Sequence, residues 1–310
     1  MTSISLVSDL LNNRRFGSSF NYEEGMEELR QKMRFLESKL GISKPADLSV
    51  GAFNSSPCAK FATNSIQIPA WFLFRHDDIP AEFQVANITD PRITDRGFLN
   101  TLATWMNHKI GQAGLTTICR PVDLGTLQFF VQLLRDRALY EKCRDFAIGH
   151  ELAHLAHSLQ REHAIMLEDI QASFSAAGIT VGIFLLAISV AFLPIINVAL
   201  TLTVTGIAVV ISGVSLIAWV NHTQVLPFPS DTQEEKNADL DSVKALQDAR
   251  GAIYYFQTSR LRHLALRNAD SSWASSIDVA GNNLRDTKHP PLSERIAYLQ
   301  TWQSEHLGRC

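Results

Sequence analysis

Two histidines and a glutamate form the string His150-Glu151-Leu152-Ala153-His154. On a helix, residues four apart lie on one face, so the two imidazoles can bind one metal ion. Glu151 lies beside them, where its carboxylate can accept a proton from an attacking water molecule. The string therefore predicts a catalytic zinc site. The alternative is an exposed polar helix face on which both histidines are merely solvated.

A third ligand is needed, because a catalytic zinc ion usually takes three protein ligands and leaves one position open. The pattern H-E-x-x-H-x-x-G-x-x-H is excluded, since His157 and Gln160 stand at its last two defined positions, although His157 could still approach the same face. Glu235 and Asp239 are four apart on a predicted helix. Glu235 would bind the metal, and Asp239 would accept the other ring N–H of a ligand histidine. Alone, this acidic segment would be an ordinary solvated helix start.

A further cluster is the string HPPLSERI, which begins at His289 and contains Arg295. We expect His289 at the mouth of the site, as a donor to the developing oxyanion. Arg295 would then orient nearby acidic groups. The alternative is a turn followed by a helix with proline in its first turn, where proline is favourable.

The stretch Phe174–Val220 is almost wholly apolar and carries no charge. It is too long for one membrane span and long enough for two, Phe174–Leu193 and Ile195–Val220, with Pro194 and Asn197 at the tip. A transmembrane helical hairpin would return both of its ends to one side of the bilayer. The parts before and after it could then build one site. The alternative is a buried helical hairpin inside a globular core.

The elements that must position these residues follow from apolar periodicity and turn signals. The histidine string lies in a predicted helix over Tyr140–Leu159. The other predicted elements are a helix over Tyr22–Leu40, strands over Leu48–Phe53 and Ser65–Phe74, a loop over 76–95, helices near 96–111 and 123–138, and a largely helical region from Thr232 onward.

These elements predict a mostly helical α+β fold, a zincin-like domain with a small antiparallel sheet and an inserted transmembrane hairpin. We expect four parts. They are an N-terminal helical region, a catalytic half with the histidine helix, the hairpin, and a helical half with the third ligand, over residues 1–42, 43–170, 171–222 and 223–310.

Composition and net charge argue against several classes of protein. The net charge of −3 provides no basic field, so nucleic-acid binding is not expected. The four cysteines form no C-x-x-C pair and no dense framework, so a disulfide scaffold is not expected. The N-terminal residues lack a basic region followed by a long apolar core, so no secretory signal is predicted.

Four elements resemble, in order, the membrane zinc endopeptidases that include bacterial HtpX, the type I CAAX prenyl protease and the mitochondrial Oma proteases. They are LESKLGI with LSVGAFNSSPCAKFAT, then GHELAHLAH, then E-x-x-A-D from Glu235, then HPPLSERIAYL. The resemblance implies that Asp239 and Arg295 support the zinc ligands His150, His154 and Glu235, with Glu151 as base and His289 as a substrate or transition-state contact. It also implies substrate binding by Gly51, Ala52 and Phe53, where the family has asparagine at the first position.

We therefore expect a membrane-anchored zinc metalloendopeptidase with one Zn²⁺ per chain. It would cleave membrane-associated or misfolded proteins. The expected location is the cytoplasmic (inner) membrane, with the catalytic part in the cytosol. Two alternatives come from other classes: a non-catalytic zinc-binding adaptor anchored in the membrane, and a protein whose hairpin perturbs membranes.

Overall fold

The structure is a computed structural model that describes residues 21–53, 55–87, 90–112, 123–160 and 231–307, with residues 207, 209 and 210. The chain divides into two units, Met1–Ala156 with Pro229–Cys310, and His157–Phe228. Among the described residues, no helix is long and apolar enough to span a membrane. The predicted hairpin over 171–222 lies almost wholly outside those residues and stays a prediction.

The first unit contains a small mixed sheet with strand order β1-β3-β2. The strands are β1 (Asp47–Gly51), β2 (Cys58–Lys60) and β3 (Ser65–Pro69). β1 pairs with β3 in parallel, and β2 pairs with β3 antiparallel. The predicted antiparallel sheet is therefore wrong. The reason is the short strand β2, which the sequence analysis missed. It reverses the chain before β3, so β3 runs in the direction of β1.

The second predicted strand was also too long. β3 ends at Pro69, and Ala70–Leu73 form a buried 3-10 helix in place of further strand. The loop predicted over 76–95 contains three more single-turn 3-10 helices, His76–Asp78, Ala81–Phe83 and Pro91–Ile93. These turns carry Phe83 into an aromatic core with Trp105 and Phe98.

Helix α2 (Tyr22–Leu40) has the bounds that the sequence predicted, so this prediction is confirmed. Its first turn is capped by Asn21, and it ends at Gly41, which has φ of 70°. A left-handed residue of this kind is the usual helix stop, and glycine adopts it without a steric penalty. The apolar stripe is buried at Met26, Leu29, Met33 and Leu36.

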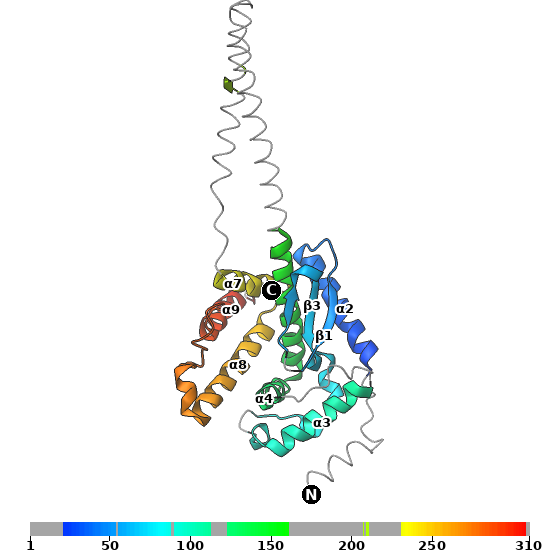
Figure 1. The fold of residues 1–310 in the computed structure, drawn as a ribbon, viewed down its shortest axis with the longest axis vertical. Helices are drawn as coiled ribbons and strands as arrows, with labels where there is room; N and C mark the ends of the chain where they lie inside the picture. The colour runs from blue at the N-terminus through cyan, green and yellow to red at the C-terminus, as the bar shows by residue number, and fades with distance from the viewer. Residues whose placement is uncertain are drawn as a thin grey trace, which may run out of the picture. The chain divides into compact units, whose positions relative to one another are not determined.

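The helix that carries the histidines covers residues 137–160 of the described chain and is called the motif helix below. In Figure 1 the sheet and α2 lie on one side of it, and α8 and α9 on the other. Lys32 of α2 forms an ion pair with Asp145 at 2.7 Å. On the opposite side, the rings of Phe146 and Phe256 meet edge to face at 5.5 Å. The motif helix therefore forms the centre of this unit.

Two helices precede it, α3 (Arg96–Gln112) and α4 (Leu124–Leu133). Both were predicted, but α4 ends earlier than expected. Asp136 accepts a hydrogen bond from the Leu139 amide at 2.9 Å and so caps the start of the motif helix. The stretch over 123–138, predicted as one helix, therefore contains both the end of α4 and the start of the motif helix.

The C-terminal part is helical, as predicted. It consists of α7 (Asp231–Leu246), α8 (Arg250–Ala269) and α9 (Leu292–Leu307). A connection over residues 270–291 joins α8 to α9 and contains the 3-10 helix Ser271–Ser275. One apolar cluster joins these helices to the motif helix through Phe146, Val243, Ala249, Ala252, Phe256, Ile296 and Leu299.

Candidate metal centre

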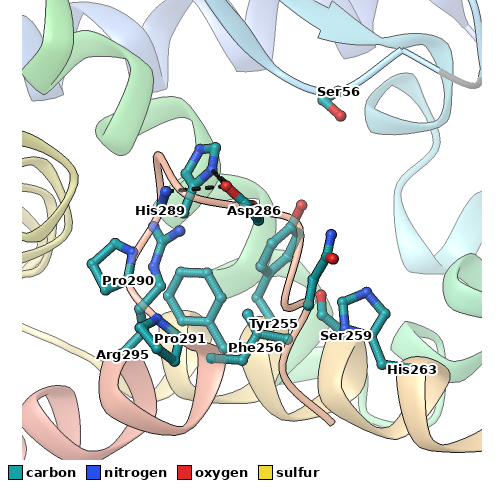
Figure 2. A pocket seen from close by; sticks show the side chains of 12 residues that line it. Ser56, Tyr255, Phe256, Ser259, His263, Asp286, His289, Pro290, Pro291 and Arg295 are labelled. Carbon is teal, nitrogen blue, oxygen red and sulfur yellow. Dashed lines mark hydrogen bonds and ion pairs between the residues drawn. The ribbon is translucent and has the colours of Figure 1, made fainter. Parts of the chain in front are cut away.

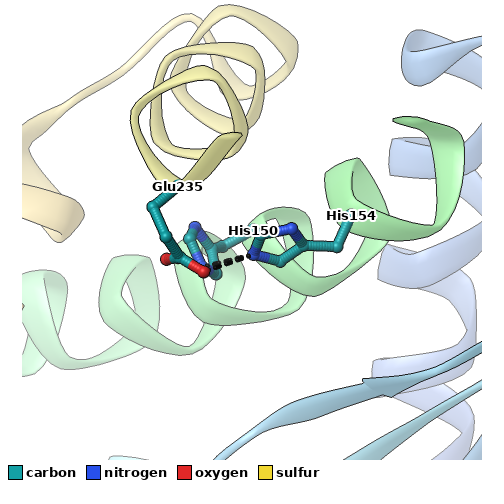
Figure 3. A group of neighbouring side chains, drawn as sticks. All are labelled: His150, His154 and Glu235. Atoms are coloured by element: carbon teal, nitrogen blue, oxygen red, sulfur yellow. Dashed lines mark hydrogen bonds and ion pairs between the residues drawn. The ribbon is translucent and has the colours of Figure 1, made fainter. Parts of the chain in front are cut away.

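Three side chains from two helices meet at one point (Figure 3). His150 and His154 project from the motif helix, and their Nε2 atoms lie 3.2 Å apart. Glu235 reaches them from α7, with Oε2 at 3.3 Å from His150 Nε2 and Oε1 at 3.1 Å from His154 Nε2. Potential ligand atoms of all three lie within 4.8 Å of one another. The predicted acid, about eighty residues downstream of His154, therefore does return to the histidine pair.

The chemistry of this set fits a zinc ion. Glu235 Oε2 is buried and accepts no aligned hydrogen bond from the described residues, although nitrogens of His150, His289 and Arg295 lie 3.3, 3.5 and 3.7 Å from it. A buried carboxylate oxygen without a partner is costly, and a cation between the three groups would satisfy it. Two imidazoles and one carboxylate form the ligand set of a catalytic zinc site, which leaves a coordination position for substrate or water.

The close approach of α7 to the motif helix depends on Gly149. A Cβ atom at this position would lie 2.4 Å from Ser242 Oγ and 3.3 Å from Ser242 Cβ. Ser242 is fully buried, and its hydroxyl donates to the Phe146 carbonyl at 3.1 Å. This contact holds the two helices together two turns away from Glu235, at a separation that requires glycine at position 149.

Asp239 lies behind His150 and is fully buried. Its Oδ1 is 2.9 Å from His150 Nδ1, at hydrogen-bond distance although not well aligned. Arg295 donates to both carboxylate oxygens, with Nε at 2.7 Å from Oδ2 and Nη2 at 2.5 Å from Oδ1. The hydroxyl of Tyr298 also donates to Oδ2. The arginine thus neutralises the buried acid that orients the first histidine.

These contacts set the charges in the metal-free protein. Burial opposes ionisation of Asp239, but Arg295 and His150 outweigh it and lower the pKa of Asp239. Burial likewise opposes a charged His150 ring, but the close carboxylates of Asp239 and Glu235 raise the pKa of His150 to about 10. Since zinc binds the neutral ring, metal binding must displace this proton.

Glu151, the predicted base, projects from the same helix towards the sheet. Its Oε2 accepts a hydrogen bond from the Ala59 amide of β2 at 2.7 Å. β2 is an edge strand, and the sequence analysis assigned no role to it. The carboxylate is thereby held between the metal ligands and a sheet edge.

His289 comes from the connection between α8 and α9. Its Nδ1 lies 2.9 Å from both carboxylate oxygens of Asp286, and its Nε2 lies 3.5 Å from Glu235 Oε2. The structure therefore brings His289 beside the ligand set. Asp286, three residues before it, was not singled out from the sequence.

Two adjoining cavities open beside these groups. The smaller, of about 180 Å³, is lined by His150, Glu151 and His289 and also by Ser56, Pro57, Phe146, Ala147, Tyr255, Phe256 and Arg295. The larger, of about 310 Å³, shares five of these residues. It extends along α8 to His263 and is also lined by Asp286 of the connection after α8 (Figure 2). Together they form a recess that can hold a substrate segment next to the metal ligands.

The expected substrate contacts Gly51, Ala52 and Phe53 are not among the described residues that line these cavities. Phe53 is 1% exposed and packs against Phe74, with ring centroids 6.4 Å apart. At Gly51 an added Cβ would require the side chain of Gln67 to shift, because its Nε2 lies 2.0 Å from the Cβ position. The structure buries Gly51 and Phe53 and places Ser56 and Pro57, which follow them, at the recess.

Comparison with protein families agrees with this geometry. The model of peptidase family M48 matches residues 132–303, more than half of the chain, from the end of α4 into α9. No curated protein and no solved structure matches the chain. The matched region contains both histidines, the glutamate that joins them, and helices α7 and α8. The chain therefore belongs to peptidase family M48, and it is a zinc metallopeptidase whose metal site is formed by His150, His154 and Glu235.

Proposed function

We propose that the protein is an endopeptidase of the HtpX, CAAX protease and Oma type, anchored in a membrane beside its substrates. The observation that carries the catalytic part is the position of Glu151. Its carboxylate lines the cavity next to His150 and is held by the edge strand β2. A carboxylate, a metal site and an edge strand thus lie close together, which supports peptide hydrolysis at this site.

The peptide would bind in an extended conformation along β2. Backbone pairing to a sheet edge holds a peptide without demanding one sequence, which suits a protease of misfolded proteins. The outward amide of Ala59 is engaged by Glu151 in the free protein. An incoming peptide carbonyl would take over this donor and release the carboxylate for catalysis.

When bound, zinc supplies Lewis-acid chemistry that lowers the pKa of water and polarises the scissile carbonyl. Glu151 accepts the proton of the attacking water and later delivers it to the leaving amine. His289, with Nδ1 bonded to Asp286, donates from its other nitrogen to the developing oxyanion when the ring is doubly protonated. Asp239 and Arg295 keep His150 oriented throughout.

The membrane part of the proposal rests on the sequence. The charge-free stretch Phe174–Val220 lies between the second and third ligands and is long enough for two spans. We propose that it anchors the protein in the cytoplasmic membrane with the peptidase unit in the cytosol. Substrates would then be membrane proteins and misfolded chains near the bilayer. Release of the full-length chain from membranes by alkaline carbonate would contradict the anchor.

Glu151→Gln tests the catalytic assignment. We expect cleavage of an unfolded protein such as casein to fall at least about 100-fold, because the base is lost, while one zinc ion per chain remains. The matched control is Glu294→Gln, which makes the same change on the exposed face of α9. Unchanged cleavage by the Glu151 variant would reject the assigned base.

A further inference from the structure

Tyr255 of α8 carries a polar group that the mechanism above does not use. It lines both cavities, the smaller one together with His150, Glu151 and His289. Its hydroxyl has no hydrogen-bond partner within the part of the chain that the structure describes. In Figure 2 the hydroxyl points into the pocket, towards the side on which Ser56 lies.

The ring of Tyr255 is fixed by three other aromatic rings. Phe129 meets it edge to face at 5.3 Å, Phe256 lies at 5.6 Å and Phe146 at 6.3 Å. The ring of Phe146 in turn lies 5.9 Å from the ring of His150. A phenylalanine would make the same ring contacts, so packing accounts for the ring and not for its hydroxyl.

The neighbouring Tyr254 shows the contrast. Its hydroxyl donates to the Gln132 carbonyl at 3.0 Å and is used within the protein. The hydroxyl of Tyr255 instead faces space that a substrate would occupy. A rigid donor without a partner, placed in the wall of a metal site, is the arrangement that stabilises charge developing on a substrate oxygen.

We propose that Tyr255 is a catalytic residue, whose hydroxyl donates a hydrogen bond to the oxyanion that forms as water adds to the scissile carbonyl. The inference deepens the proposed function and rests on hydrolysis at this site. The tyrosine keeps its proton throughout, so it contributes stabilisation of charge and no proton transfer. It would act together with His289, which lies in the connection between α8 and α9.

Two features suit the hydroxyl to this role. Burial raises the pKa of Tyr255 to about 12, and the charge of Glu151 adds to the shift, so the group remains a donor across the working pH range. It also donates in every protonation state of His289. The Nδ1–H of that histidine donates a hydrogen bond to the Asp286 carboxylate, so its second nitrogen can donate only when both ring nitrogens carry a proton.

The test is Tyr255→Phe, with Tyr254→Phe as the matched control. Loss of one oxyanion donor lowers kcat by about 100-fold or more, so we expect kcat on a peptide substrate to fall by about that factor, with KM and zinc content unchanged. A phosphonamidate peptide, which mimics the tetrahedral oxyanion, should lose affinity by a similar factor. Tyr254→Phe should keep kcat and lower the melting temperature.

A Tyr255→Phe enzyme that keeps its kcat, or that loses activity only through a higher KM, would overturn the inference. Equal loss of phosphonamidate affinity in the Tyr254 control would also overturn it, because the effect would then be structural. Glu151→Gln separates this result from the proposed function. If Glu151→Gln abolishes cleavage and Tyr255→Phe does not, only the role of Tyr255 fails.

Discussion

Replacement of Gly149 by alanine tests how α7 is held against the motif helix. The new Cβ would lie 2.4 Å from Ser242 Oγ, about 1 Å closer than two such atoms tolerate. Ser242 is fully buried and bonded to the Phe146 carbonyl, so its side chain cannot rotate without losing that bond. Because the Ser242 Cβ would also lie only 3.3 Å from the new Cβ, we expect helix α7 to move away, and Glu235 to move with it.

The magnitudes predict a larger effect on zinc than on folding. Overpacking a core costs about 1–3 kcal/mol, and alanine regains about 1 kcal/mol over glycine within a helix. We expect a net loss of stability of about 1 kcal/mol in the metal-free protein. Displacement of a ligand's support typically weakens metal binding by about 10–100-fold. Competition with a chelator of known affinity measures the second effect, and urea unfolding measures the first.

Three variants complete the design. Gly149→Ala with Ser242→Ala removes the oxygen that collides, so zinc affinity should recover. Ser242→Ala alone should bind zinc normally and lose about 1 kcal/mol with its hydrogen bond. Gly111→Ala in α3 has nothing within 4 Å of the new Cβ and should leave zinc affinity unchanged. If Gly149→Ala binds zinc like the parent protein, or if the double variant does not recover, the helix contact does not position Glu235.

Three further outcomes are expected. Asp239→Asn leaves Arg295 buried without its counter-charge, so unfolding free energy should fall by about 3–5 kcal/mol and zinc affinity by about 10–100-fold; normal urea and chelator titrations would contradict the role of this pair. Removal of zinc by a chelator should lower the melting temperature, and added zinc at 100 times its Kd should restore about 2.7 kcal/mol, whereas a metal-independent transition would argue against a ligated native state. Burial opposes ionisation of Asp248, but bonds to Arg250 and Lys142 lower its pKa below the ordinary 3.8, so this stabilisation is present above pH 3.8 and is lost as pH falls through the lowered value. The stability difference between the parent and Asp248→Asn, followed by urea unfolding from pH 6 to pH 3, should therefore shrink at the acid end, and a constant difference would refute the assignment.

The sequence was most informative where local chemistry and tertiary structure agree. Helix α2 has an asparagine cap, a stripe of apolar residues at helical spacing and a glycine stop, so its limits could be read directly. The metal ligands could also be predicted, because imidazoles at positions i and i+4 and a glutamate with a carboxylate four residues later have few other uses together.

The rest depended on contacts that no local pattern encodes. β2 has only three residues, too few for an alternating pattern, yet it reverses the chain and decides the direction of β3. Phe53, which the resemblance implies as a substrate contact, is buried against Phe74, a contact that no local pattern predicts. Tyr255 lies between Tyr254 and Phe256 on α8, a setting typical of a core residue. Only the fold shows that its hydroxyl faces the cavity.

The ligands of the metal lie on both sides of a long intervening segment, with about eighty residues between His154 and Glu235. A bound ion therefore acts as a cross-link that closes this segment into a loop. The entropy of loop closure grows only with the logarithm of length, by about 0.6 kcal/mol for each doubling. A change in the length of this segment should therefore alter zinc affinity only slightly.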